Sequence, residues 1–349
     1  MTLHTPLCDL LGVRYPIVQT GMGWVAGPRL AATTSNAGGL GILAAATMSL
    51  DELNDAIVEM KSRTREPFGV NLRTDAPDIT DRIDLMIEQR VKVASFAMAP
   101  RADLVAKLKE GGLVVIPSIG AKRHAEKVVE MGVDAVLVQG GEGGGHTGSV
   151  PTTLLLPQVV DAVNVPVIAA GGFFDGRGLV AALAYGAQGI AMGTRFLLTK
   201  ESTVPDAVKE LYLGKTVNDT VVTTKVDGFS HRVLRTEFVD ELQKAGRVRT
   251  LARALSNALA YKRYAHAKLS DMLREGLAMR KTNDLSFGQM LMAANAPMFL
   301  RAAMVEGSLS FGVFASGQVV GVIDDLPAVA EVIERIVKEA EATLGKLAP

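Results

Sequence analysis

The residue with the clearest potential for acid–base chemistry is a histidine in a glycine-rich run. His146 directly follows three glycines, within the segment Gln139–Gly148. An imidazole exchanges a proton near neutral pH, and the neighbouring glycines offer it little to pack against. We therefore expect His146 to act at a reaction centre, as a base or as a donor that orients the substrate. Glu142, in the same run, is expected to serve as a second acid/base or to orient the loop.

Two other strings have residue types suited to binding a phosphate group. Gly171-Gly172 and Gly193-Thr194 each follow a short apolar segment. Glycine lets backbone N–H groups approach an anion closely, and the threonine hydroxyl can add a further donor. In barrels of alternating strands and helices, the loops after the seventh and eighth strands often form such a site. A monophosphate cofactor on a barrel suggests flavin mononucleotide (FMN).

Eight short apolar segments recur over the first 215 residues and would place these strings at strand ends. Their length and their valine and isoleucine content are typical of buried parallel strands. Helical patterns lie between them, and Ser49 or Asp51 is a candidate cap for one. Eight such units in about 200 residues predict an α/β fold, a (β/α)8 TIM barrel, with a doubly wound open sheet as the alternative. The predicted strands are Pro16–Gln19, Gly39–Leu43, Phe68–Leu72, Val91–Phe96, Leu113–Pro117, Ala135–Gln139, Val165–Ala169 and Gly189–Met192.

Further candidates for ligand contacts follow the first, third and fifth of these segments. Gly21 and Gly23 would let the backbone approach a flat ligand. Asn71 offers an amide that can both donate and accept, and Ser118 offers a hydroxyl. Trp24 is expected either to wall the ligand site or to pack in the core.

The alternation of strands and helices ends near Tyr212. Residues 216–310 are predicted to be mainly helical, with Arg247–Lys268 and Leu285–Met304 as the clearest helices. Residues 311–349 hold a glycine-rich turn and a final helix that returns to the barrel, with Asp325 as its expected cap. The chain is thus divided into a cofactor-binding barrel (1–215), a helical insertion (216–310) and a returning segment (311–349). Because barrel active sites lie at the carboxyl ends of the strands, the insertion is expected near that face, where it could serve as a lid.

The charged residues balance over the whole chain but not locally. The 349 residues include 37 Lys+Arg and 37 Asp+Glu, so the formal net charge is zero. This argues against a nucleic-acid or membrane-surface binder. Between residues 225 and 281, however, thirteen basic residues stand against six acidic ones, a net of +7. A basic lid suits a polyanionic carrier such as coenzyme A. The alternative is a solvated helical surface or an oligomer contact, and a homo-oligomer stays open.

Several kinds of site and segment are not expected. The single cysteine, Cys8, excludes an internal disulfide framework and a cysteine-cluster metal site, and no metal is predicted. No signal peptide or apolar run of about 18–20 residues is evident, so a cytoplasmic protein is expected. Gly143–Gly148 satisfies GxGxxG, but Pro151 and the lack of a suitably placed acidic residue argue against a dinucleotide site. The other histidines are expected to be surface or packing residues: His4, His124, His231 and His266.

Taken together, the strand-end strings resemble the nitronate monooxygenase (2-nitropropane dioxygenase) family and the related FMN-dependent enoyl-ACP reductases. The similarity extends to family members that act on a CoA thioester in actinobacterial steroid catabolism. The resemblance covers most of the chain and lies in Gln19–Trp24, Gly69–Asn71, Gly140–Gly148, Ala169–Gly178, Gly189–Phe196 and Gly317-Gln318.

The resemblance implies a barrel that binds FMN non-covalently, with His146 over the flavin as the base. It also implies which residues contact the cofactor. These are Gln19, Gly21, Met22, Asn71, Gln139, Gly144, Gly171, Gly172, Gly193 and Thr194, with Ser118 and Gln318 as further candidates.

The residues and the resemblance together predict an FMN-dependent oxidoreductase that transfers hydride between a substrate carbon and the flavin. The resemblance implies that the substrate is a CoA thioester in steroid ring degradation and that the reaction introduces a ring double bond. A CoA thioester suits this chemistry because its α-proton is unusually acidic. Three alternatives are kept. They are a nitronate monooxygenase that uses O2, an NAD(P)H-dependent enoyl-thioester reductase, and a flavin-binding module without turnover.

Overall fold

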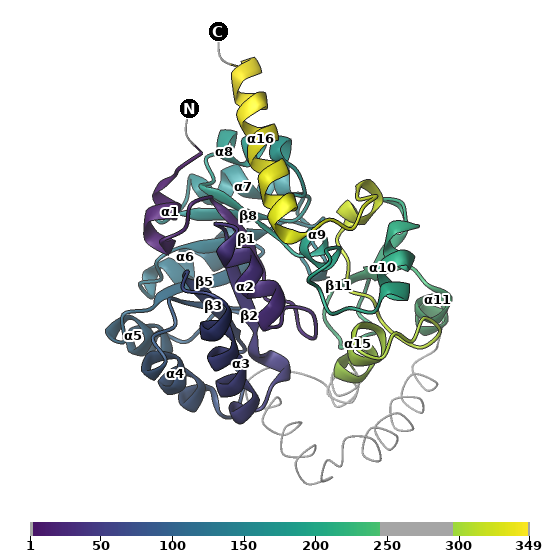
Figure 1. The fold of residues 1–349 in the computed structure, drawn as a ribbon, viewed down its shortest axis with the longest axis horizontal. Coiled ribbons are helices and arrows are strands. Elements are labelled where there is room, and N and C mark those ends of the chain that lie inside the picture. Colours follow the sequence, from purple (N-terminus) through teal and green to yellow (C-terminus); the bar gives the residue numbers. More distant parts are fainter. Residues whose placement is uncertain (1–2, 245–295, 348–349) are drawn as a thin grey trace.

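The barrel strands follow one another in sequence order around a closed sheet. The computed structural model describes residues 3–244 and 296–347 (Figure 1). Eight parallel strands form the barrel, and β1 closes it by pairing with β9. The strands are β1 (Ile17–Gln19), β2 (Leu40–Ala44), β3 (Phe68–Leu72), β4 (Val93–Phe96), β5 (Val114–Ile119), β6 (Val136–Gln139), β8 (Val167–Ala170) and β9 (Gly189–Met192). The predicted (β/α)8 barrel is confirmed, and the open-sheet alternative is wrong because the sheet closes.

Helices between the strands cover the outside of the barrel. At the start of α3, Ser49 and Glu52 cap each other's backbone N–H groups, at 3.2 and 2.7 Å. At the start of α8, Asp175 accepts the N–H of Gly178 at 2.8 Å. Each bond satisfies an amide that has no partner within its helix. The helices are α2 (Pro28–Asn36), α3 (Leu50–Arg63), α4 (Ile79–Glu88), α5 (Ala102–Glu110), α6 (Lys122–Glu130), α7 (Thr152–Val160) and α8 (Gly176–Ala184), with the 3-10 turn η1 (Ala45–Thr47) before α3.

The eighth helical position is filled from the far end of the chain. The helix that follows β9, α9 (Thr194–Leu197), has only four residues. The long helix α16 (Val329–Leu347) packs against both α8 and α2. Figure 1 shows α16 lying beside α8 and extending past it.

The cap expected for this last helix is wrong. The Asp325 carboxylate instead binds Arg195, at 2.8 Å, and Arg335. The N–H of Val329, at the start of α16, donates to Glu201 Oε2 at 2.9 Å. A carboxylate distant in sequence therefore does the capping, while Asp325 joins Arg335 of α16 to Arg195 of α9.

Two apolar layers hold the barrel together. In the interior, Leu7, Cys8 and Leu11 of α1 (Pro6–Leu11) pack with inward-facing strand residues. A Cβ on Gly189, the first residue of β9, would lie 2.7 Å from the Leu7 side chain, so α1 closes the amino-terminal end. The second layer lies between the sheet and its helices. The carboxyl-terminal end of the barrel is therefore the end left for polar groups.

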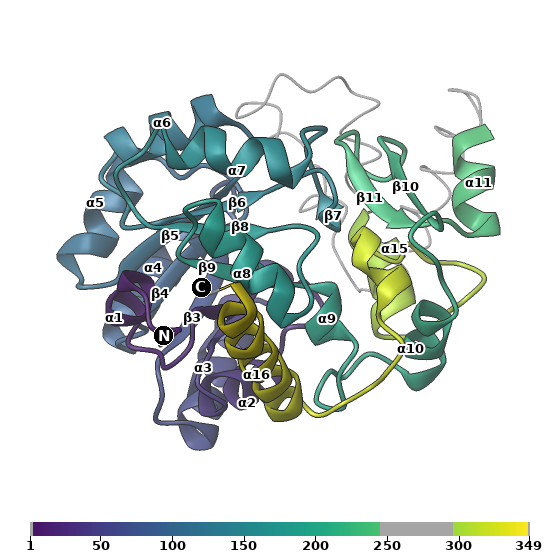
Figure 2. The same ribbon diagram turned by 90° about the horizontal axis from the view of Figure 1, so that it is seen from above.

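A smaller unit stands beside the barrel and contains strands that the sequence analysis missed. β10 (Thr220–Thr223) and β11 (His231–Leu234) form an antiparallel sheet with β7 (Gly145–His146), which belongs to the loop after β6. Figure 2 shows this sheet next to α10, α11 and α15, away from the barrel helices. The prediction that residues 216–310 are mainly helical missed these strands, because β10 and β11 have four residues each and β11 also pairs with a strand 85 residues earlier in the chain. The helices are α10 (Asp206–Leu213), α11 (Glu237–Lys244) and α15 (Ala296–Met304).

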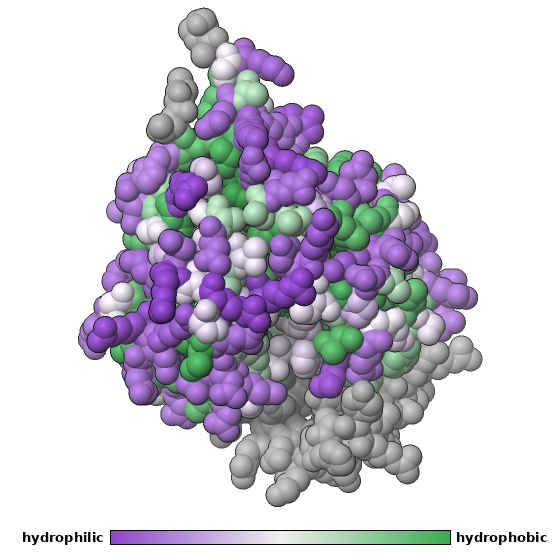
Figure 3. Space-filling view, in the orientation of Figure 1, coloured by the Kyte–Doolittle hydropathy of each residue, from purple (hydrophilic) through white to green (hydrophobic). Residues whose placement is uncertain are grey.

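Part of the predicted insertion lies outside the described residues. This holds for Arg247–Lys268 and for the start of Leu285–Met304, of which α15 covers the end. Of the charged residues counted from 225 to 281, four basic and four acidic ones are described, so the whole basic excess falls in the remainder. None of the helices in the described ranges is long and apolar enough to cross a membrane. The face drawn in Figure 3 is mostly hydrophilic.

Candidate active site

A polar layer caps the apolar interior at the carboxyl ends of the strands. Ile116 belongs to the interior, and Ser118 faces the same way because strand side chains alternate. Gln139 likewise lies two residues after Leu137, an interior residue of β6, and faces the same way. On the neighbouring strands β3 and β4, Asn71 Nδ2 donates to Ser95 Oγ at 3.1 Å. Ser95 is buried and was not predicted. The predicted residues of β3, β5 and β6 thus lie at one end of the barrel.

The end of β1 presents a buried acceptor without a donor. Gln19 Nε2 donates to the carbonyl oxygens of Ile42, at 3.1 Å, and Thr20. The Gln19 Oε1 atom has no hydrogen-bond partner among the residues described. Such a group is costly unless a ligand satisfies it. Gly21, two residues on, packs closely on Asn71, where a Cβ would lie 2.4 Å from the Asn71 Cβ.

The loops after β8 and β9 bring glycine backbone to the same end. Gly171 and Gly172 have φ of +89° and +87°, a conformation that strains residues with a Cβ. A Cβ on Gly193 would lie 3.4 Å from the Met22 sulfur and from the Thr20 hydroxyl. The loops after the first and last barrel strands therefore adjoin. The glycines of these loops place no side chain of their own between the backbone and a ligand, as an anion site requires.

Three segments that are distant in sequence meet at Thr194. The Thr194 hydroxyl accepts the N–H of Gly317 at 3.0 Å. A Cβ on Gly144 would lie 2.5 Å from the same Gly317 nitrogen, so the backbone approach requires glycine. The N–H of Gln318, the first residue of η2 (Gln318–Val322), donates to the Glu142 carbonyl at 3.0 Å. The Thr194 oxygen thus accepts a hydrogen bond from the protein backbone, which leaves its O–H group able to donate to a ligand.

Two side chains fix the loop that carries His146. The Glu142 carboxylate accepts the N–H of Thr152 at 3.0 Å and its hydroxyl at 2.6 Å, at the start of α7. Gln139 Nε2 donates to the carbonyls of Gly144, at 3.3 Å, and His146, at 2.8 Å. This favours the loop-orienting role among the two expected for Glu142. Because Gln139 Nε2 is used within the loop, Gln139 Oε1 is the atom that would contact a cofactor.

His146 belongs to a cluster that joins the barrel loop to the smaller unit. The pairing of β7 with β11 places His146 opposite His231, and the two ring centroids are 4.7 Å apart. His146 Nε2 lies 2.6 Å from Asp227 Oδ2. The side chain of His146 is 61% exposed, whereas that of Asp227 is 9% exposed. The imidazole of His146 is thus exposed on one side and held by a buried carboxylate on the other.

The cluster favours the ionised form of Asp227. Burial alone would raise the pKa of this carboxyl, but the hydrogen bond from His146 and the nearby His231 hold the pKa well below its ordinary value. His231 was expected to be a surface or packing residue, and Asp227 was not considered. Asp227 lies 81 residues from His146, so no local pattern joins them.

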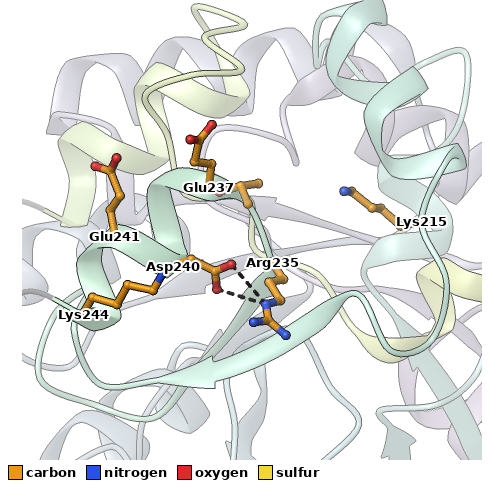
Figure 4. A pocket seen from close by; sticks show the side chains of 7 residues that line it. Lys215, Arg235, Glu237, Asp240, Glu241 and Lys244 are labelled. Atoms are coloured by element: carbon orange, nitrogen blue, oxygen red, sulfur yellow. Dashed lines mark hydrogen bonds and ion pairs between the residues drawn. The ribbon is translucent and has the colours of Figure 1, made fainter.

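The open recess in Figure 4 lies elsewhere, around α11. It has a volume of about 510 Å³ and is lined by both basic and acidic residues, among them Lys215 and Lys244. Arg235 and Asp240, which also line it, form an ion pair whose closest atoms are 3.0 Å apart. None of the predicted site residues lines it. The mixed charge makes it a poor match for an anionic cofactor.

Comparison with known proteins decides the family. The family described as nitronate monooxygenase matches residues 4–87 and 79–339. The chain belongs to this family. It is therefore an oxidoreductase of the nitronate monooxygenase type, and membership implies a flavin cofactor.

Individual relatives are similar over nearly the whole chain. A Mycobacterium tuberculosis (strain H37Rv) protein is 61% identical over 343 residues, which are 97% of each chain. One from Rhodococcus jostii (strain RHA1) is 60% identical over 339 residues, 97% of this chain and 96% of the relative. Both are named (3aS,4S,5R,7aS)-5-hydroxy-7a-methyl-1-oxo-octahydro-1H-indene-4-carboxyl-CoA dehydrogenase. Among solved structures, FabK from Thermotoga maritima shares 37% identity with a TM-score of 0.81, over 99% of both chains.

Proposed function

We infer that this protein is an FMN-dependent dehydrogenase that acts on a bicyclic carboxyl-CoA thioester from steroid ring degradation. The observation that carries this inference is the identity of about 60% to two relatives named for such a substrate, over nearly their full lengths. In the substrate of that name, the thioester is attached to ring carbon 4, so the hydrogen on this carbon is acidified by the thioester carbonyl. Removal of that proton together with a hydride from a neighbouring carbon would leave a ring double bond.

The residues at the barrel mouth fit FMN. Gln19 Oε1 is a buried acceptor that a flavin N–H would satisfy. The positive φ of Gly171 and Gly172, which glycine adopts without strain, leaves a backbone surface on which a phosphate could lie beside the Thr194 hydroxyl. Gly193 is proposed to line the phosphate site next to Thr194. The remaining predicted contacts are proposed to surround the ring system: Gly21, Met22, Asn71, Ser118, Gln139, Gly144 and Gln318. When bound, the flavin supplies the acceptor for the hydride.

The chain's own part in the reaction is proton transfer and positioning. His146 is the proposed base, because it is the exposed titratable group on the loop beside the barrel mouth. Glu142 anchors that loop to the start of α7 through Thr152, and Gln139 donates to a backbone carbonyl of the loop, that of His146. We assign Glu142 to this anchoring role. The basic segment after residue 244 is proposed to attract the CoA phosphates, while a cytoplasmic location and the oligomeric state stay predictions.

Anaerobic mixing of the yellow holoenzyme with single reductants tests the proposed function. Bleaching of the flavin by a bicyclic steroid-derived CoA ester, and not by propionate 3-nitronate, is the expected result. Bleaching by the nitronate alone would identify a monooxygenase. Bleaching by NAD(P)H alone would identify a reductase, and no bleaching by any of the three would favour a binding module. Mass analysis of the released flavin should give FMN.

A further inference from the structure

Both oxygens of the Asp227 carboxylate, which contacts His146, have hydrogen-bond partners. Oδ1 accepts the backbone N–H of Phe229 at 3.0 Å, which fixes the carboxylate on its own turn. Oδ2 lies 2.6 Å from His146 Nε2. The Phe229 ring meets the His146 imidazole edge-on at 6.0 Å. The carboxylate is therefore held in place independently of any ligand.

The charge state of this carboxylate decides which nitrogen of His146 carries the proton. An ionised carboxylate has only acceptors, so at 2.6 Å the hydrogen must come from Nε2. A neutral imidazole has one N–H, which leaves the lone pair on Nδ1. We propose that Asp227 is a positioning residue that fixes His146 in the Nε2–H form and makes Nδ1 the atom that takes the substrate proton. This inference rests on the proposed role of His146 as base.

The buried His231 contacts both Asp227 and His146. It is 3% exposed, and its Nδ1 lies 3.5 Å from Asp227 Oδ2 while its ring lies against His146. Among the described residues, the charged side chains next to the cluster have other partners: the Arg232 guanidinium donates to the Gly141 carbonyl, and the Glu142 carboxylate accepts from Thr152. Asp227 is thus the carboxylate that faces the imidazole, and it would stabilise the imidazolium formed when Nδ1 takes a proton.

A metal ion is the competing explanation for these three side chains. Their ligand atoms all lie within 4.8 Å of one another. However, the 2.6 Å separation of Nε2 and Oδ2 is that of a hydrogen bond. Two atoms that share a tetrahedral zinc ion stand farther apart, because each lies about 2.0–2.2 Å from the ion. The geometry therefore favours a shared proton over a shared ion.

The ¹⁵N spectrum of the histidine rings tests the proposal without turnover. In holoenzyme labelled with ¹⁵N-histidine, His146 is assigned by its absence in His146→Asn. The neutral ring should show Nε2 protonated and Nδ1 unprotonated, and Asp227→Asn should give a mixture of the two forms. An Nδ1–H form in the wild type, or the same pure form in Asp227→Asn, would overturn the proposal. Stoichiometric Zn²⁺ binding that is lost in Asp227→Asn and His231→Ala would overturn it in favour of a metal site.

The kinetic arm separates this inference from the proposed function. In Asp227→Asn, kcat should fall by roughly 10²–10⁴-fold with KM little changed. The acidic limb of the rate profile should move to lower pH, because the charge that favours the imidazolium is gone. Asp55→Asn, an exposed change on α3, is the matched control and should leave the profile unaltered. An unchanged kcat and profile in Asp227→Asn would assign Asp227 to folding alone. If His146 shows the expected tautomer but no CoA ester reduces the bound flavin, the proposed function is contradicted and the role of Asp227 in fixing the tautomer stands.

Discussion

Replacing Thr194 by valine tests the proposed cofactor site with a change of nearly constant shape. Valine keeps the branched side chain but has no hydroxyl. Thr194 is 8% exposed and accepts the Gly317 N–H at 3.0 Å, so the variant leaves a buried donor unpaired. That loss should lower the free energy of unfolding of the apoprotein by about 1–3 kcal/mol.

The same change also removes the donor proposed for the FMN phosphate. A hydrogen bond to a charged group contributes about 1.5–3 kcal/mol. Since about 1.4 kcal/mol corresponds to a tenfold change in Kd, the Kd for FMN should rise by roughly 10–100-fold. Titration of apoprotein into FMN, followed by quenching of flavin fluorescence, measures this change directly.

A control and a rescue keep the two effects of Thr194→Val apart. Thr199 is fully buried, and its hydroxyl donates to the Phe196 carbonyl at 2.7 Å. Thr199→Val should lower stability and leave the FMN Kd unchanged, whereas Thr194→Ser should restore both quantities. A Thr194→Val protein with lowered stability and the wild-type Kd for FMN would refute the phosphate assignment.

Three further predictions follow from the site and the fold. His146→Ala should lower turnover by roughly 10²–10⁴-fold while the bound-flavin spectrum is retained; a wild-type rate would make His146 structural. Burial raises the pKa of Asp325, but Arg335 and Arg195 more than offset it and keep the pKa below its ordinary value. The stability from these pairs is therefore present above about pH 4 and lost as the pH falls further. Asp325→Asn should cost roughly 1–3 kcal/mol at neutral pH, discounted for partial exposure, and this difference should shrink below pH 4 in denaturant titrations; a pH-independent cost would contradict the assignment. Finally, KM for the CoA thioester should rise with ionic strength more steeply than KM for the matching pantetheine thioester. Parallel curves would argue against a phosphate role for the basic segment.

The barrel could be predicted because buried parallel strands leave a strong local pattern. Each of the eight predicted segments overlaps an observed strand, and Phe68–Leu72 and Gly189–Met192 match without a shift. Ser49, one of the two candidate caps of α3, was accessible for the same reason, since its partner Glu52 is three residues away; the other candidate, Asp51, lies inside the first turn. Features that depend on neighbours in sequence were therefore accessible.

Features created by contacts between distant segments were not. β10 and β11 are four residues each, and β11 pairs with a two-residue strand in the loop after β6. That pairing brings Asp227 and His231 to His146. The same limit explains the wrong cap for α16, because Glu201 reaches it from another part of the chain. The residues around His146 could only be recognised once the loop and the smaller unit were seen together.

This chain is expected to remove two hydrogen atoms from the ring of a CoA thioester. A single turnover without oxygen, with flavin absorbance and substrate mass followed in the same sample, shows whether it does. Each flavin bleached should yield one product molecule lighter than the substrate by two hydrogens, with the CoA thioester intact. Bleaching without such a product, or a flavin that stays oxidised in excess thioester while a nitronate reduces it, would overturn the proposed function.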